Sequence, residues 1–255
     1  EVMPVKGEPY YVNESHILTL KRSYIGSCRL SDGTYVPADQ EILNVGLKVW
    51  TESSKATQKL FKGYRAGPLE FHREQAALPI PPYILGAWLG DGHSEGPTIS
   101  KPYGKMVQAW IEYGLSMGLN TFEYQKKHSD CPAWRLAPSE DGKVQFGNPV
   151  RELLRGLGLV GSKHIPEIYR LASVQDRLQL IAGLLDSDGH HTHGGYDWIS
   201  KDREMAEAFV FICRSVGLAA YLKPCQKGIL SRGFVGNYFR VSVSGGCERI
   251  PCLDK

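Results

Sequence analysis

A short motif occurs twice in this chain, and it constrains the fold more than any other feature. The copies are ILGAWLGDG at residues 84–92 and IAGLLDSDG at residues 181–189. Each copy is an apolar run that ends in a small residue followed by Asp-Gly. A single run of this kind is a weak signal, because apolar helices often end in Asp-Gly. Two runs predict a duplicated unit that brings two carboxylates together.

Other repeated segments support a duplication. Residues 106–119 and 205–218 share Met, Ala, an aromatic residue, Ser and Gly-Leu in one register, 99 residues apart. The tripeptide Ile-Ser-Lys also recurs, at residues 99–101 and 199–201. A solenoid repeat is only about 20–50 residues long. We therefore expect a duplicated α/β subdomain.

Composition limits the class of protein. The chain has 255 residues, an apolar fraction of 42% and a net charge of +3, as in a globular protein that can bind nucleic acid. The six scattered cysteines lack a CxxC pair, which argues against a zinc site and for an intracellular protein of the cytoplasm or nucleus. The sequence contains neither a membrane-spanning run nor a signal peptide. We expect a protein that is neither secreted nor membrane-bound.

The pattern along the chain predicts four regions. Residues 1–48 mix β-branched and aromatic residues with turn residues, which indicates a small all-β segment. Residues 49–78 form a linker or accessory region with a helix around residues 55–61. Residues 79–166 and 167–255 each hold one motif helix, followed by strands and an amphipathic helix.

Periodicity predicts which side chains of the two halves pack. In the amphipathic helix of the first half we expect four apolar residues on the packed face: Trp110, Ile111, Leu115 and Met117. In the second half, residues 239–244 alternate as in a strand, so that Val241 and Val243 pack while Arg240 points outward.

Helical spacing predicts that the two motif helices contact each other. Gly86 and Gly90 are four residues apart, as are Gly183 and Ser187, so each helix has a face without bulk. Two such faces allow a close approach of the backbones.

Asp91 and Asp188 end the two motifs in unfavourable positions. Each lies at the negative pole of its helix, and the two carboxylates repel each other unless a cation compensates. Hard divalent cations suit such a pair, and Mg²⁺ keeps waters that can serve as nucleophiles. Either Asp alone also fits an ordinary turn. The pair in register predicts metal-dependent phosphodiester chemistry.

The two motifs resemble the signature helices of single-chain LAGLIDADG homing endonucleases. The resemblance covers roughly residues 79–255 and implies an α+β fold. Its two αββαββα halves have pseudo-two-fold symmetry, and their antiparallel sheets bind DNA. It implies Asp91 and Asp188 as catalytic and metal-binding residues, with Gly90 and Ser187 as further metal ligands. The implied cofactor is Mg²⁺ or Mn²⁺, with Ca²⁺ as a non-catalytic substitute.

The same resemblance implies two catalytic lysines. Residues 154–166 are similar to the block that follows the first half in intein-borne members, and the basic active-site residue of that block is Lys163 here. The end of the second half, SGGCERIPCLDK, implies Lys255 in the same way. A lysine near the scissile phosphate can offset developing charge or orient the attacking water. Each could instead be an ordinary surface lysine.

The N-terminal segment resembles part of an intein splicing domain. VNESHILTL, residues 12–20, is similar to the block whose histidine assists the first acyl shift, which implies His16. A plain strand histidine is the alternative. The chain begins at Glu1 and ends at Lys255 without the residues that splicing requires at both ends. We expect that the chain as given does not splice.

The expected partner is a long double-stranded DNA site, bound by a monomer. Polar and basic residues on the strands after each motif are the candidate DNA contacts: Ser100, Lys101, Lys126, Lys127, Arg135, Ser200, Lys201, Lys223, Lys227, Arg232 and Arg240. The histidines of residues 190–193 are expected to form a polar loop rather than a metal site.

Two other functions compete with the endonuclease. An RNA maturase could use the same fold, but it has no need of the splicing-like segment. A catalytically inactive DNA-binding module has no need of two intact acids.

Overall fold

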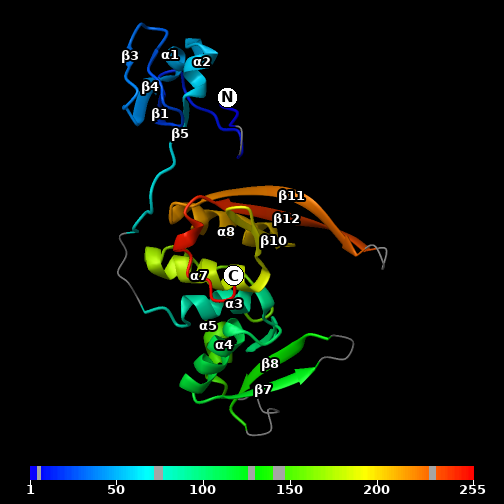
Figure 1. Cartoon of the computed structure of the whole chain (residues 1–255). Helices are drawn as coiled ribbons and strands as arrows, with labels where there is room; N and C mark the ends of the chain where they lie inside the picture. Colours follow the sequence, from blue (N-terminus) through cyan, green and yellow to red (C-terminus); the bar gives the residue numbers. More distant parts are fainter. Residues whose placement is uncertain (5–6, 72–76, 126–129, 140–146, 230–233) are drawn as a thin grey trace. The chain divides into compact units, whose positions relative to one another are not determined.

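A computed structural model of the chain describes residues 1–4, 7–71, 77–125, 130–139, 147–229 and 234–255. These residues form two compact units, Glu1–Ala66 and Gly67–Lys255 (Figure 1). No helix within the described ranges has both the length and the apolar character needed to cross a membrane. The six cysteines, all of them described, are free thiols.

The first unit is built on an antiparallel sheet with strand order β4-β1-β5. Its elements are β1 (Ile17–Arg22), β2 (Cys28–Arg29), β3 (Tyr35–Val36), β4 (Ile42–Gly46), α1 (Leu47–Glu52), α2 (Lys55–Lys59) and β5 (Phe61–Gly63). Alternation along β1 buries Leu18 and Leu20. Because β5 pairs with β1, the unit extends to Ala66, and the expected boundary at residue 48 is too early.

The second unit contains two antiparallel sheets with helices packed on them. Its helices are α3 (Pro82–Asp91), α4 (Lys105–Ser116), α5 (Pro149–Gly156), α6 (Glu167–Arg170), α7 (Val174–Asp188), α8 (Arg203–Ser215) and the 3-10 helix η2 (Cys247–Arg249). Its strands are β6 (Thr98–Ser100), β7 (Asn120–Gln125), β8 (Pro132–Ala137), β9 (His190–Thr192), β10 (Gly195–Ser200), β11 (Ala219–Ile229) and β12 (Phe234–Ser244).

The motif helices α3 and α7 lie side by side in the middle of this unit (Figure 1). Helix α4 packs on the sheet with order β6-β8-β7, and α8 packs on the sheet with order β11-β12-β10-β9. One hydrophobic core runs through both halves. The expected mixed architecture of helices and antiparallel sheets is therefore present.

The two halves differ in their strands. In the described residues the first half has three strands and an isolated bridge between Gly92 and Ile99, whereas the second half has four strands. Only residues 93–98 separate the two bridge partners, so the chain turns back before a second strand can form. The αββαββα order expected for each half is thus incomplete in the first. In the second half, His190 and His191 lie in β9, which pairs with β10, so these two are in a strand and not in the expected loop; His193 lies in the turn that follows.

Two glycines set the close contact between α3 and α7. A Cβ added to Gly86 would lie 2.3 Å from the Leu180 carbonyl oxygen, and one added to Gly183 would lie 2.1 Å from the Tyr83 carbonyl oxygen. Only residues without a Cβ allow such an approach of the two backbones. The contact that the spacing predicted between the motif helices is confirmed.

The packed faces agree with the predicted ones at most positions. Val241 and Val243 of β12 are buried, as the alternation predicted. On α4, Trp110 is buried, but Leu115 is 62% exposed. The inward face of α4 is instead completed by Tyr113 and Gly114, so the prediction for Leu115 is wrong.

Candidate active site

Two acids meet where the motif helices end. Asp91 is the last residue of α3 and Asp188 is the last residue of α7. A Cβ added to Gly90 would lie 3.2 Å from Asp188 Oδ2, which shows how close the second acid comes to the first motif. Asp188 is exposed when the whole residue is considered, but protein atoms surround its carboxyl group and desolvate it. This desolvation, and then the nearby Asp91 carboxylate, raise the pKa of Asp188.

Lys163 binds the end of α3. It lies in the loop between α5 and α6, and its Nζ donates to the carbonyl oxygens of Leu89 (3.0 Å), Gly90 (3.2 Å) and Gly92 (2.6 Å). The ammonium is also 5.1 Å from the centre of the Trp88 ring. A cation at the carbonyl end of a helix complements the helix dipole. Burial lowers the pKa of Lys163 to about 8, and the two acids oppose this effect.

Lys255 binds the end of α7 in a similar way. Its Nζ donates to the Leu185 carbonyl oxygen at 2.7 Å and to the Gly189 carbonyl oxygen. Burial, and then the charge of Lys101, lower its pKa. Each motif helix therefore ends in an acid with a lysine bound to the neighbouring carbonyls.

A third lysine joins this group. Lys101 follows β6, and its Nζ lies 2.9 Å from Asp91 Oδ2 and also donates to the Ser187 carbonyl oxygen. The Trp134 indole fixes the backbone here by donating to the Lys101 carbonyl oxygen at 2.8 Å. From the sequence, Lys101 was expected only as a DNA contact. Its place between the two motifs was missed because the Ile-Ser-Lys repeat contains no signal for the side-chain direction.

The oxygen atoms around Asp91 fit a hard divalent cation as ligands. Asp91 Oδ2 is buried, and among the described residues it accepts no hydrogen bond; the Lys101 ammonium lies 2.9 Å from it. That ammonium also contacts the Ser187 carbonyl oxygen. The acid of one motif and a carbonyl oxygen of the other thus contact the same positive charge. Both groups offer oxygen ligands, which hard divalent cations prefer. In the described part of the chain no three His, Cys, Asp or Glu side chains gather as a metal site.

Three of the candidate DNA contacts share a face of the larger sheet. Lys223 lies opposite Arg240 in the β11–β12 pairing, and Lys227 lies further along β11 on the same face. Val241, next to Arg240, points to the core. Arg240 Nη1 lies 3.7 Å from Asp197 Oδ2. The open face of this sheet is therefore rich in basic residues.

The other candidate DNA contacts are more dispersed. Ser100 Oγ is 2.7 Å from His93 Nε2, and the Arg135 guanidinium stacks 4.7 Å from the Tyr124 ring. Ser200 accepts a hydrogen bond from the Asp202 backbone, and Lys201 is exposed. Lys126, Lys127 and Arg232 lie outside the described residues.

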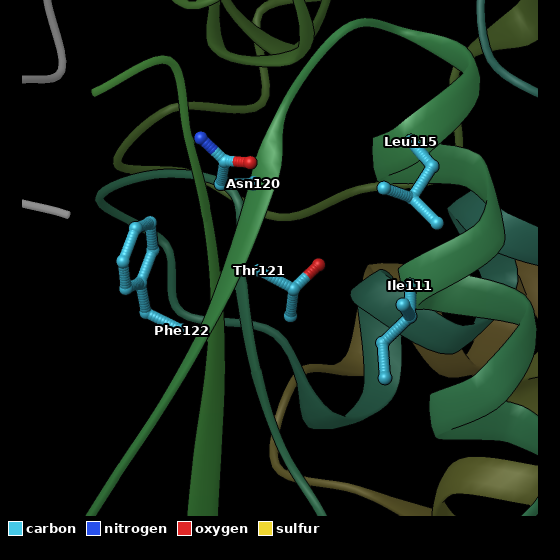
Figure 2. Close-up of a pocket in the computed structure, with 5 residues that line it drawn as sticks. All are labelled: Ile111, Leu115, Asn120, Thr121 and Phe122. Carbon is cyan, nitrogen blue, oxygen red and sulfur yellow. The ribbon is translucent and has the colours of Figure 1, made fainter. Parts of the chain in front are cut away.

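Two further features involve residues other than the acids. His16 directly precedes β1 in the first unit, where its carbonyl oxygen accepts from the Leu47 N–H at 2.9 Å, and its implied splicing role stays a prediction. A shallow pocket between α4 and β7, shown in Figure 2, is lined by Ile111, Leu115, Asn120, Thr121 and Phe122. It contains none of the candidate catalytic residues.

Comparisons with known proteins give limited matches. No family model matches the chain. The replicative DNA helicase DnaB of Mycobacterium intracellulare is 34% identical over 116 residues, which are 46% of this chain but only 15% of the helicase. Among solved structures, mesophilic variants of the homing endonuclease I-DmoI match with a TM-score of 0.42 and 14% identity, over 65% of this chain and 88% of that chain. I-DmoI in complex with DNA and Mn matches with a TM-score of 0.40 and 14% identity, over 65% and 89% of the two chains.

Proposed function

We propose that this chain is a site-specific, divalent-metal-dependent DNA endonuclease of the LAGLIDADG type. The observation that carries the proposal is the convergence of Asp91 and Asp188 at the ends of two tightly packed helices, with Lys101, Lys163 and Lys255 around them. Two acids and three lysines in one place are costly for stability alone, because like charges repel and buried ammonium groups lose hydration. Such arrangements are typical of catalytic sites.

Each group of the site has a task in phosphodiester hydrolysis. Asp91 and Asp188, with the carbonyl oxygens of Gly90 and Ser187, would hold the metal ions, which supply Lewis acidity and an activated water. The lysines at the two helix ends donate hydrogen bonds to phosphate oxygens as negative charge develops there. One acid and one lysine at each helix end provide a set of groups for each DNA strand.

The basic face of the larger sheet supports the choice of DNA as substrate. Lys223, Lys227 and Arg240 project from it. Lysines that contact phosphates give affinity without sequence preference, and side chains on strands can reach base edges in the major groove.

The helicase match and the N-terminal unit support an origin as an insertion in a host protein. A match confined to 15% of a replicative helicase is expected if the two proteins share an inserted segment rather than a helicase fold. The segment around His16 has the pattern of a splicing block, as an intein-borne endonuclease requires. We propose that the first unit is part of such a splicing domain.

The test uses DNA of the host gene that lacks the insertion and spans the insertion point, called the joint. We expect a double-strand cut at the joint in Mg²⁺ or Mn²⁺, and binding without cutting in Ca²⁺, measured by gel electrophoresis. Binding without cutting in Mg²⁺ would instead indicate an inactive DNA-binding module. Preferential binding of a structured intron RNA would indicate a maturase.

Replacing Lys101 by methionine is expected to strengthen metal binding. The change removes a positive charge that contacts both Asp91 and Ser187, where a divalent ion would bind. We expect Ca²⁺ to bind about tenfold more tightly, equivalent to about 1.4 kcal/mol. Calorimetric titration measures this directly, with Lys201→Met as the control from the repeated tripeptide. Equal or weaker Ca²⁺ binding by Lys101→Met would contradict the proposed ion position.

A further inference from the structure

We propose that Asp186 is a positioning residue for the endonuclease site, because its carboxylate holds residues 253–255 so that the Lys255 ammonium stands at the end of α7. The inference rests on the proposed function, since it gives Lys255 a task in that reaction. Asp186 is the earlier of the two acids in IAGLLDSDG, and the first motif has Leu89 at the equivalent position. The two halves therefore differ at this position.

Three hydrogen-bond donors surround the Asp186 carboxylate. The residue is fully buried. Its Oδ2 accepts from the Tyr83 hydroxyl at 2.8 Å and from the Leu253 N–H at 2.6 Å, and its Oδ1 accepts from the Asp254 N–H at 3.2 Å. Burial, and then the bond to Asp186, raise the pKa of Tyr83, so the hydroxyl stays protonated and donates. Because the Asp186 carboxylate is buried, it keeps these hydrogen bonds only while residues 253–255 are in place.

Residues 253–255 are also fixed to another helix. The Asp254 carboxylate accepts from the Lys105 N–H at 3.0 Å and from the Met106 N–H at 2.9 Å, in the first turn of α4. The residue before that helix, Gly104, provides no side-chain cap. Asp254 therefore caps α4 from a distant part of the chain. Asp186 thus holds the backbone of residues 253–254, and α4 holds the Asp254 side chain. The Lys255 side chain then reaches the carbonyl oxygens of Leu185 and Gly189.

The first half holds its lysine by other means. Lys163 is bound to three carbonyl oxygens and stacks on Trp88. Two residues later, the buried Ile165 anchors the loop in the hydrophobic core. Residues 253–255 are held instead by the polar contacts of Asp186 and Asp254.

The first test measures amide hydrogen exchange in Asp186→Asn. Asparagine has nearly the same size, but its amide nitrogen is a donor, so a backbone N–H loses its acceptor. We expect exchange at the Leu253 and Asp254 amides to accelerate by at least about tenfold, with no change in the centre of α7. The control is Asp176→Asn on the same helix, whose carboxylate bonds the nearby Ser173. Unchanged exchange at residues 253–254 in Asp186→Asn would overturn the proposal.

A second variant keeps the inference testable if Asp186→Asn does not fold. In Lys255→Met the two amides should remain protected, because Asp186 rather than the lysine holds the backbone. Loss of their protection in this variant would show that Lys255 holds the segment, and would also overturn the proposal.

A double-mutant cycle separates positioning from general stability. We expect Asp186→Asn to slow cleavage by about tenfold in the wild-type background and to have no further effect in Lys255→Met. Equal slowing in both backgrounds would mean a structural role and would refute positioning. If the wild type cuts no DNA under any condition, the proposed function fails, while the exchange data still decide whether Asp186 holds the segment.

Discussion

Replacing either Asp91 or Asp188 by asparagine is expected to slow DNA cleavage on the order of a thousandfold or more. Asparagine keeps the shape of the side chain but removes the negative charge that binds a divalent ion. Each acid ends a different motif helix, so neither can replace the other. Single-turnover cleavage in Mg²⁺ measures the loss.

DNA binding provides the control for these two variants. We expect the Kd in Ca²⁺ to stay within about threefold of the wild type, because affinity comes mainly from phosphate contacts elsewhere. Asp176→Asn in the first turn of α7 should cut as the wild type does. A parallel loss of binding and cleavage in Asp91→Asn and Asp188→Asn would instead assign the acids a structural role.

Replacing Gly86 or Gly183 by alanine is expected to destabilise the second unit strongly. The added Cβ would lie 2.3 Å or 2.1 Å from a backbone carbonyl oxygen of the facing helix. Backbone atoms cannot rotate away as a side chain can, so α3 and α7 must separate. We expect a loss of about 3 kcal/mol in the free energy of unfolding and a fall of about 6–12 °C in Tm.

Gly156→Ala is the matched control for the helix contact. Gly156 ends α5, and a Cβ added there has no atom within 4 Å among the described residues. Its effect should stay within about 1 kcal/mol. Thermal unfolding followed by circular dichroism compares the three variants. A Tm of Gly86→Ala close to that of Gly156→Ala would contradict the close contact.

The sequence was most informative where spacing alone determines geometry. Four-residue spacing of small residues predicted the contact between the motif helices, because positions four apart share a helix face. Alternation predicted the buried side of β12 for the same kind of reason. The acids were identifiable because they end two apolar runs in equivalent positions.

Features that depend on tertiary contacts could not be predicted from the sequence. Leu115 fits the apolar stripe of its helix, yet it is exposed, while the neighbouring Tyr113 and Gly114 are buried. Lys101, which directly follows β6, contacts both Asp91 and the Ser187 carbonyl oxygen through the tertiary fold. The hydrogen bonds of Asp186 to Leu253 and Asp254 join residues almost 70 positions apart, and no local pattern contains that information.

The most direct test is a selection of cleavable sites from a random DNA library. Circular plasmids with randomised inserts are incubated with the wild type, or with the Asp91→Asn/Asp188→Asn double variant, in Mg²⁺ or EDTA, and linearised molecules are sequenced. We predict that the wild type in Mg²⁺ linearises plasmids that share one long sequence, and that the double variant and the EDTA sample do not. Linear products without a common sequence, or equal linearisation by the double variant, would contradict a site-specific endonuclease whose catalytic acids are Asp91 and Asp188.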